Sequence, residues 1–321
     1  MLPDIYRETL ARYWGFTSFR PMQEEIIESV VSGKDVVGLL PTGGGKSVTY
    51  QVPPVASEGL CLVITPLIAL MKDQVARLKT MNIKAMAIHS GMSREEVEIS
   101  LDNCLYGDYR LLYVSPERLQ TPLFRARLPR FNFTLVAVDE AHCISQWGYD
   151  FRPSYLHIAA IRDLMNEEVP FLALTATATP RVVDDIISRL RMKDPKVLKT
   201  SFRRSNTTHM VRGLEDKSPY VMRSPKKEQG SGITYVWSRK RIKDVDERLV
   251  GYQLRDVFYH AGMAKVMTDG TQTSWSSGET RVIVATNAFG MGIDKADVRF
   301  VIHWDCPDSI EAYYQESGRA G

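Results

Sequence analysis

A glycine-rich stretch near the amino terminus carries the residue types that bind phosphate. It follows an apolar run and reads Pro41-Thr42-Gly43-Gly44-Gly45-Lys46-Ser47. Glycines let the backbone fold closely around oxygen atoms, and their N–H groups point inward together with the positive end of a following helix. In such a loop Lys46 can reach the β and γ phosphates of a nucleotide, and the Ser47 hydroxyl can bind Mg²⁺. Leu40 stands where the pattern asks for glycine, so a glycine-rich turn that binds nothing remains an alternative at this point.

Two adjacent acids supply the carboxylates that a phosphate loop needs. Asp139 and Glu140 follow the apolar run Phe133–Val138, which we expect to be a buried strand. Asp139 would hold Mg²⁺ through water, and Glu140 would polarise the attacking water. The alternative is a solvated acidic turn. Combined with Lys46 and Ser47, the acids predict a nucleoside triphosphatase.

Short β-branched runs alternate with helical patterns, which predicts an α/β fold with mainly parallel sheets covered by helices. Helices are expected, for example, over Ile68–Met81 and Arg94–Leu105. In the first half the expected strands lie near Val36–Leu40, Leu60–Thr65, Ala85–His89, Leu111–Ser115, Leu135–Asp139 and Phe171–Thr175.

The rhythm of strands restarts after Thr200. The strands expected there lie near Thr208–Arg212, Ile233–Val236, Asp256–His260, Arg281–Ala285 and Phe300–Trp304. We therefore expect two tandem α/β units, residues 1–204 and 205–321, with a linker around Thr200–Ser205. Ligands of parallel sheets bind beyond the carboxyl ends of the strands, so the polar residues that follow the strands are expected to share one cleft.

Composition sets broad limits on the class of protein. A chain of 321 residues suits roughly two domains of about 150 residues each, and its 44% hydrophobic and 25% charged residues are ordinary for a soluble globular protein. A net charge of +3 is too small to indicate a nucleic-acid binder, although a local basic groove would suffice. The four cysteines form no C-x-x-C pair, which argues against zinc and disulfides and fits a reducing compartment. Neither a signal peptide nor a membrane-spanning helix is expected.

Several motifs resemble those of superfamily 2 helicases and, more specifically, of the RecQ-family DNA helicases. Asp139-Glu140-Ala141-His142 and Thr175-Ala176-Thr177 are similar to motifs II and III, and Cys143–Pro153 resembles the aromatic-rich loop of the RecQ family. The remaining similarities are Gly15–Gln23 to motif 0, Ala285–Lys295 to motif V and Tyr313–Gly321 to the start of motif VI. RecQ proteins tolerate a residue other than glycine at the position of Leu40.

The resemblance implies two tandem RecA-like domains and an adenine site. Phe16 would offer an aromatic face, Arg20 a stacking guanidinium and Gln23 an amide for the edge of the base. Alternatively, Phe16 and Phe19 belong to the core and Arg20 is a surface charge. The resemblance also implies that His142 senses the γ-phosphate and that Asp294 accepts the ribose hydroxyls.

The aromatic-rich loop suits single-stranded DNA, because every base has a π-face and stacking on it tolerates any sequence. Trp147, Tyr149 and Phe151 provide rings, and Arg152 provides a cation. Packing of Trp147 against Phe151 in a core is the alternative. The family usually has histidine where this chain has Tyr149, which puts an ionisable link between strand binding and hydrolysis in doubt.

Phosphate contacts to DNA are expected from the loops at the strand ends, because small hydroxyls and N–H groups there bind phosphate without reading sequence. For several of these residues a helix-capping role is an equal alternative. The candidates are Thr65, Pro66, Lys72, Ser115 and Arg118 in the first unit, and Ser238, Arg239 and Thr286 in the second.

Motif VI supplies further candidate catalytic residues, Gln315 and Arg319. Arg319 would be an arginine finger that the second unit provides to the nucleotide on the first. Other stretches depart from the family. Trp237 replaces a small or polar residue, Ser218–Gly232 is rich in proline and glycine, and Ala264–Thr273 lacks an expected arginine.

The whole pattern implies an ATP- and Mg²⁺-dependent 3′→5′ DNA helicase motor that acts on single-stranded and forked DNA in repair and recombination. We expect a monomer without zinc and without membrane contact, near the nucleoid if bacterial and in the nucleus if eukaryotic. Two alternatives stay open, a hydrolytically weakened DNA-binding fragment and an RNA-directed helicase of the same superfamily.

The family pattern continues past Gly321 with a second arginine, so we expect ATP hydrolysis to be slower than in a longer chain that includes it. The difference in rate is measured as steady-state phosphate release by this chain and by the longer chain. The Arg319→Ala variant of each chain is measured beside it. Equal rates for the two chains would contradict this expectation, and an unchanged Arg319→Ala variant would show that Arg319 is not the finger.

Overall fold

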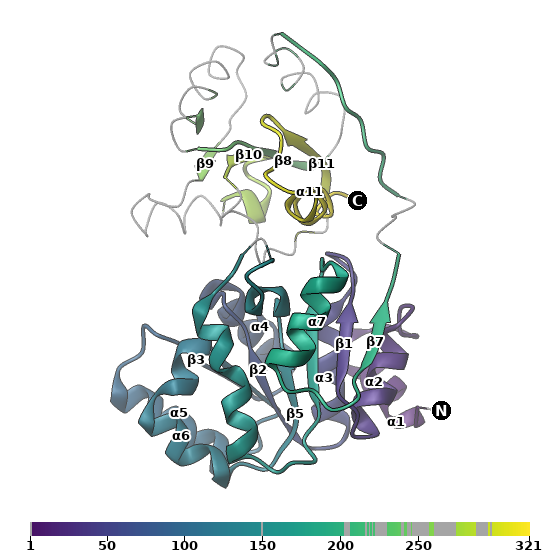
Figure 1. Ribbon diagram of the computed structural model, residues 1–321. Coiled ribbons are helices and arrows are strands. Elements are labelled where there is room, and N and C mark those ends of the chain that lie inside the picture. Colours follow the sequence, from purple (N-terminus) through teal and green to yellow (C-terminus); the bar gives the residue numbers. More distant parts are fainter. Residues whose placement is uncertain are drawn as a thin grey trace. The chain divides into compact units, whose positions relative to one another are not determined.

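The computed structural model describes residues 2–148, 150–201, 206–215, 217, 219, 221, 230–238, 241–242, 245, 257–259, 274–286, 295 and 297–321. The chain divides into two compact units, Met1–Ser201 and Phe202–Gly321 (Figure 1). Each unit is built around a parallel sheet, as the alternation of strand and helix patterns predicts.

The first unit contains seven parallel strands in the order β3-β4-β2-β5-β6-β1-β7. All six strands expected from the sequence of this unit are confirmed, with ends that differ by at most two residues. The strands are β1 (Val36–Leu39), β2 (Leu60–Ile64), β3 (Ala85–Ile88), β4 (Leu111–Val114), β5 (Phe133–Val138), β6 (Phe171–Thr175) and β7 (Lys196–Lys199).

Strand β7 was not expected from the sequence. It is a short edge strand, Lys196-Val197-Leu198-Lys199, in which Leu198 alone is buried. A lysine-flanked strand of this kind carries little apolar signal, and it forms because its backbone pairs with β1.

Helices cover both faces of the first sheet (Figure 1). Alternate strand residues face two separate cores, because successive side chains of a strand point to opposite faces. One core packs against α2 (Gln23–Val31), α3 (Lys46–Ala56) and α4 (Ile68–Thr80). The other packs against α5 (Arg94–Tyr106), α6 (Pro122–Arg127), α7 (Pro180–Arg189) and the 3-10 helices η4 (Ala141–Ile144) and η5 (Pro153–Leu164). The remaining elements of this unit are α1 (Asp4–Thr9), η1 (Leu10–Trp14), η2 (Pro116–Gln120) and η3 (Leu128–Arg130).

The second unit contains four described strands, all parallel, in the order β11-β8-β10-β9. They are β8 (Ser231–Tyr235), β9 (Val257–Tyr259), β10 (Val282–Ala285) and β11 (Val298–His303), and they confirm four of the five strands expected there. Helix α11 (Ile310–Ser317) follows β11, and Ser309 caps its amino end, because the Ser309 hydroxyl accepts from the Ala312 N–H.

The strand expected near Thr208–Arg212 is wrong. Residues 206–215 form no strand, and Val211 and Met210 are largely exposed. The β-branched residues there suggested a strand, but they have no buried face to pack, and burial is what gives such residues their preference for strands. The expectations for Ala264–Thr273 and for most of Ser218–Gly232 fall outside the described residues.

A buried carboxylate, Asp35, ties three segments of the first unit together. Its Oδ1 accepts from the Phe171 N–H at 2.7 Å, and its Oδ2 accepts from Arg162 at 2.7 Å and from the Lys193 N–H at 2.9 Å. Asp35 is 5% exposed, so these donors have little access to water as a substitute.

Replacing Asp35 by alanine should lower the free energy of unfolding by about 3–5 kcal/mol, because a buried guanidinium and two N–H groups lose their acceptor. Urea denaturation followed by circular dichroism measures the loss. Glu167→Ala is the matched control, since its ion pair with Lys193 is exposed and should contribute less than about 1 kcal/mol. Similar losses for both variants would contradict the role given to Asp35.

Candidate functional site

The phosphate loop connects β1 to α3, at the carboxyl edge of the sheet. Gly43 and Gly45 have φ angles of +73° and +74°, a conformation that side chains disfavour, and a Cβ on Gly44 would lie 2.8 Å from the Pro41 carbonyl oxygen. Helix α3 begins at Lys46 directly after Gly45, so its unpaired N–H groups and its dipole face the loop. This geometry is that of an anion site, which Thr42 and Ser47 border with half-buried hydroxyls.

The expected adenine residues lie against this loop. Gln23 donates from its amide to the Gly45 carbonyl at 2.9 Å and accepts from the Arg20 N–H at 2.8 Å, and the Arg20 guanidinium donates to the Gly43 carbonyl. Phe16 is about half exposed, which does not fit a place in the core. The structure thus brings Arg20 and Gln23 to the phosphate loop, and binding of a base by Gln23 would require its amide to exchange partners.

The acid pair stands at the end of β5, next to Lys46. The Lys46 Nζ lies 4.0 Å from the Glu140 Oε1, and both side chains are largely buried. Glu140 has a φ of +48°, an uncommon conformation for a residue with a side chain, and it turns the chain so that the carboxylate faces the lysine. The Tyr155 hydroxyl donates to the Asp139 carbonyl at 2.9 Å and holds this turn.

Charge is concentrated at Asp139. Burial and the neighbouring Glu140 carboxylate raise its pKa to about 6, and Lys46 opposes that rise. A buried carboxylate with excess negative charge around it favours a hard cation, and the oxygen donors of Asp139 and Ser47 are of the type that Mg²⁺ prefers. The donor set at this edge therefore fits Mg²⁺.

His142 connects the acid pair to the end of β6. Its Nδ1 lies 2.9 Å from the Thr175 Oγ1 and 3.4 Å from the Glu140 Oε2. The Thr175 hydroxyl is also 3.1 Å from the Thr177 carbonyl. Burial lowers the pKa of His142, so the ring is neutral near pH 7 and acts as a hydrogen-bonding link between motifs II and III.

The aromatic-rich loop follows η4 on the same edge. Trp147 is 59% exposed and Phe151 is half-buried, so Trp147 does not pack in a core, while Tyr149 lies outside the described residues. The Arg152 guanidinium donates to the Asp150 Oδ2 at 2.9 and 3.1 Å and to the Pro66 carbonyl at 3.3 Å. Arg152 therefore ties the loop to the end of β2 instead of extending into solvent.

His142, Cys143 and Asp150 lie close enough together to bind a metal ion. Asp150 is already paired with Arg152, and burial raises the pKa of the Cys143 thiol so that it keeps its proton. The thiol lies 3.7 Å from the Asp150 Oδ2, so we interpret this cluster as a hydrogen-bonded link between the aromatic-rich loop and motif II.

The expected phosphate-binding residues of the first unit differ in what they offer. Thr65 and Ser115 are buried at the ends of β2 and β4, and neither hydroxyl has a hydrogen-bond partner within the described part of the chain. Lys72 on α4 is exposed. Arg118 donates to the carbonyls of His89, Ser90 and Met92, so its guanidinium holds the turn after β3.

Two candidates of the second unit, Thr286 and Ser238, directly follow or lie shortly after described strands. Thr286 is buried directly after β10, and Ser238 after β8 accepts from the Arg241 N–H at 3.3 Å, as a capping residue would. Arg239 and Asp294 lie outside the described residues. Gln315 is buried on α11.

Arg319 follows α11 and hydrogen-bonds the Tyr235 hydroxyl at the end of β8. Burial raises the pKa of Tyr235 to about 12, so the phenol stays protonated beside the guanidinium. Tyr235 had not been predicted as a site residue, because a tyrosine that ends a buried strand looks like core in the sequence.

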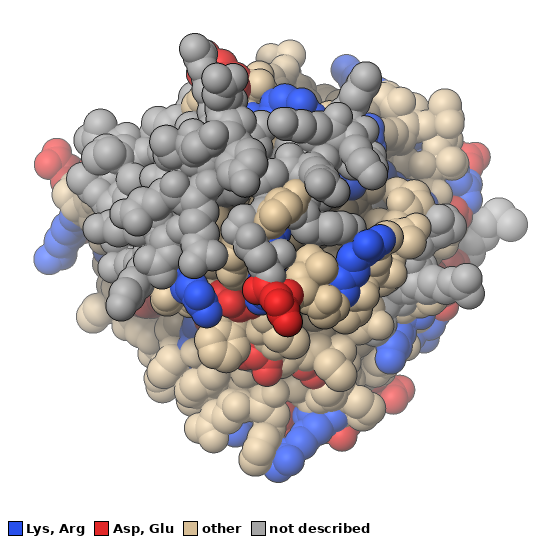
Figure 2. Space-filling model, turned by 90° about the horizontal axis from the view of Figure 1, so that it is seen from above, with Lys and Arg blue, Asp and Glu red and all other residues tan. Residues whose placement is uncertain are grey.

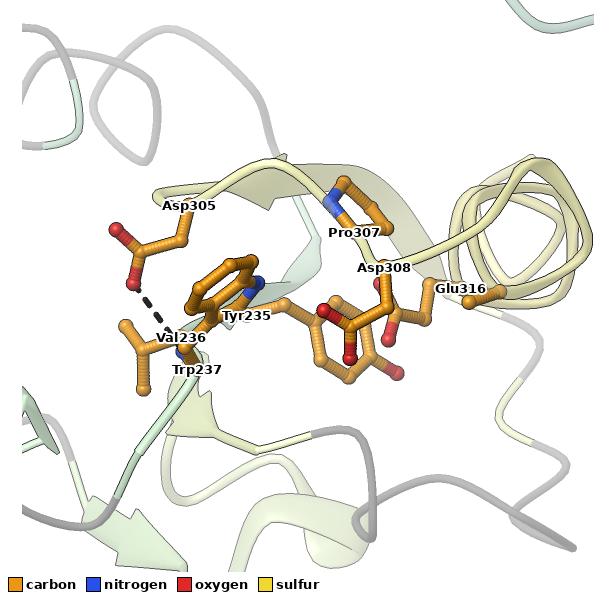
Figure 3. A pocket seen from close by; sticks show the side chains of 8 residues that line it. Tyr235, Val236, Trp237, Asp305, Pro307, Asp308 and Glu316 are labelled. Carbon is orange, nitrogen blue, oxygen red and sulfur yellow. Dashed lines mark hydrogen bonds between the residues drawn. The ribbon is translucent and has the colours of Figure 1, made fainter. Parts of the chain in front are cut away.

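A pocket of the second unit lies beside this pair, lined by Tyr235, Trp237, Asp305, Asp308 and Glu316 (Figure 3). The indole N–H of Trp237 donates to the Cys306 carbonyl at 2.7 Å, and its backbone N–H donates to the Asp305 Oδ2 at 3.1 Å. Three carboxylates in one pocket repel phosphate, so this pocket does not suit a nucleotide and the phosphate loop remains the candidate site.

Basic side chains are distributed without a strong concentration on the face shown in Figure 2. Lys and Arg alternate there with Asp and Glu, and the described residues form no large patch of one sign on that face. This mixture of signs fits the small net charge of +3.

Two profile comparisons cover most of the chain. Residues 20–186 match the family model for the DEAD/DEAH box helicase, and residues 216–321 match the helicase conserved C-terminal domain. No helix within the described ranges is long and apolar enough to cross a membrane.

Curated relatives include the ATP-dependent DNA helicase RecQ of Bacillus subtilis, which is 43% identical over 97% of this chain and 53% of its own length. The probable ATP-dependent DNA helicase RecS of the same organism is 40% identical over 98% of this chain and 64% of its own length. The chain thus spans about half the length of the RecQ proteins it matches.

Solved structures share the fold at low identity. The helicase Lhr of Mycobacterium smegmatis, bound to ssDNA and AMP-PNP, has a TM-score of 0.76 at 18% identity and covers 99% of this chain and 46% of Lhr. Dbp5 of S. cerevisiae, bound to RNA and ADP BeF3, has a TM-score of 0.74 at 14% identity and covers 100% of this chain and 84% of Dbp5. The fold is the tandem RecA-like fold of helicases, and the chain belongs to the DEAD/DEAH box helicase family as a RecQ-family helicase core.

Proposed function

We propose that this chain is the motor of a 3′→5′ DNA helicase, which couples ATP hydrolysis to movement along single-stranded DNA and to separation of a duplex. The observation that carries the proposal is the continuous set of contacts Lys46–Glu140–His142–Thr175 at the edge of the first sheet. It joins a phosphate loop to motif III within one unit.

In this proposal the phosphate loop holds the triphosphate, with Lys46 on the β and γ phosphates and Mg²⁺ between Ser47 and Asp139. Glu140 orients the attacking water. Because His142 contacts both Glu140 and Thr175, a change at the γ-phosphate would reach motif III through one neutral ring. Phe16, Arg20 and Gln23 would take the adenine after the loop contacts rearrange.

DNA is the proposed track because the aromatic-rich loop is the stretch that most resembles the RecQ family, and the curated relatives are named DNA helicases. Trp147 exposes its ring as a stacking platform, and Arg152 fixes the loop to Pro66. The buried, unpartnered hydroxyls of Thr65 and Ser115 within the described ranges support phosphate contacts at the adjacent strand ends.

Arg319 is proposed as the arginine finger, and its hydrogen bond to the Tyr235 hydroxyl would orient the guanidinium. The ribose contact of Asp294 and the DNA contacts of Ser238, Arg239 and Thr286 also remain proposals, as do forked DNA as substrate and duplex unwinding by this chain. RNA as the track remains an outcome to test.

Lys46→Ala should lower the rate of ATP hydrolysis about 100-fold, because the cation that neutralises the phosphates is lost. Phosphate release is measured with and without a thymidine oligonucleotide, and Lys79→Ala, an exposed lysine on α4, is the control. If single-stranded DNA does not stimulate ATP hydrolysis by the wild-type protein, the result favours a hydrolytically weakened DNA-binding fragment. If a uridine oligoribonucleotide stimulates hydrolysis more strongly than the thymidine oligonucleotide does, it favours an RNA-directed helicase.

Glu140→Gln should separate binding from chemistry. The amide keeps the volume of the side chain but cannot act as a base, so hydrolysis should fall about 100-fold or more while ATP affinity changes little. Affinity is read from a fluorescent ATP analogue and hydrolysis from phosphate release, with the exposed Glu95→Gln as control. A parallel loss of both quantities would show that Glu140 acts in binding.

A further inference from the structure

Helix α7 contacts the aromatic-rich loop at two points that the proposed helicase mechanism does not use. The guanidinium carbon of Arg181 lies 3.3 Å from the centroid of the Trp147 ring. One turn further along, Asp185 accepts from the Ser145 hydroxyl at 2.6 Å, and the Ser145 oxygen accepts from the Trp147 N–H at 3.1 Å. Residues four apart share one face of a helix, so Arg181 and Asp185 both contact the aromatic-rich loop from the same face of α7.

The helix that carries Arg181 is firmly placed. It begins three residues after Thr177, Thr179 caps it by accepting from the Val182 N–H, and Pro180 occupies its first turn. Val182 and Ile186 are buried in the core of the first unit. Arg181 therefore reaches the indole from a fixed base, even though its own side chain is exposed.

The distance of 3.3 Å is that of a planar guanidinium stacked on the indole. The stack covers one face of the ring, and Trp147 as a whole stays 59% exposed, which leaves surface for a second planar group. A ring already held in one orientation loses less conformational entropy when a base stacks on it. Ser145 fixes the backbone of Trp147 and Arg181 fixes its side chain.

We propose that Arg181 is a positioning residue for single-stranded DNA, which holds the indole of Trp147 in the plane that a base stacks on. The proposal rests on the proposed function, since it assumes that Trp147 stacks on DNA. It extends the DNA site from the aromatic-rich loop to the first turn of α7, the helix that directly follows motif III.

Arg181→Ala should raise the dissociation constant for a fluorescein-labelled thymidine oligonucleotide about two- to fivefold, the range expected for loss of an exposed cation–π contact. Arg181→Lys should recover part of the loss, because an ammonium keeps the charge but not the flat stack. Arg189→Ala, an exposed arginine on the same helix, is the control and should bind as the wild type does. Unfolding temperatures of all variants check that the fold is retained.

A double-mutant cycle with Trp147→Ala separates positioning from a direct phosphate contact. If Arg181 acts through the indole, Arg181→Ala has no further effect once Trp147 is alanine, and the dependence of binding on salt stays the same. Additive losses, together with a salt slope reduced by about 0.7, would overturn the proposal in favour of a phosphate contact.

Two other results would also overturn it, and they can be told apart. Wild-type protein that binds the oligonucleotide, with an Arg181→Ala variant of equal affinity, removes the role of Arg181 and leaves the proposed function standing. Wild-type protein that does not bind the oligonucleotide removes both.

Discussion

The parallel direction of the strands is the constraint on which the rest of the first unit depends. Because all seven strands run the same way, every loop that follows a strand opens on one edge. The phosphate loop after β1, the acids after β5 and motif III after β6 are neighbours for that reason, since β5, β6 and β1 are adjacent in the sheet. Residues far apart in the sequence meet without any long loop to carry them.

Burial gives this edge its chemistry. Lys46, Glu140 and His142 are largely withdrawn from water, so each charge acts strongly on its neighbours. The raised pKa of Asp139 and the lowered pKa of His142 have the same cause, the loss of hydration, with opposite effects on an acid and a base. The result is a negative site that favours a cation beside a neutral ring that can relay a change in hydrogen bonding.

Several polar groups predicted to bind ligands also hold loops of the protein in the structure. Arg20 and Gln23 bind carbonyls of the phosphate loop, Arg118 binds three carbonyls after β3, and Arg152 ties the aromatic-rich loop to Pro66. A guanidinium has five N–H donors and finds carbonyl oxygens wherever a loop exposes them. Such residues set the shape of the site, and Gln23, whose amide already binds the phosphate loop, would have to exchange a partner to contact a ligand.

The amino-acid sequence by itself determined the phosphate loop, the acid pair and nearly all the strands, because glycine conformation, adjacent carboxylates and runs of buried β-branched residues are local signals. The sequence did not predict β7, because the lysines of this edge strand give little apolar signal. It wrongly predicted a strand at Thr208–Arg212, because the β-branched residues there have no buried face to pack. Only the tertiary structure decided which side chains meet. The stack of Arg181 on Trp147 and the bond from Arg319 to Tyr235 join residues that no spacing connects, since sheet order and helix packing alone bring them within contact.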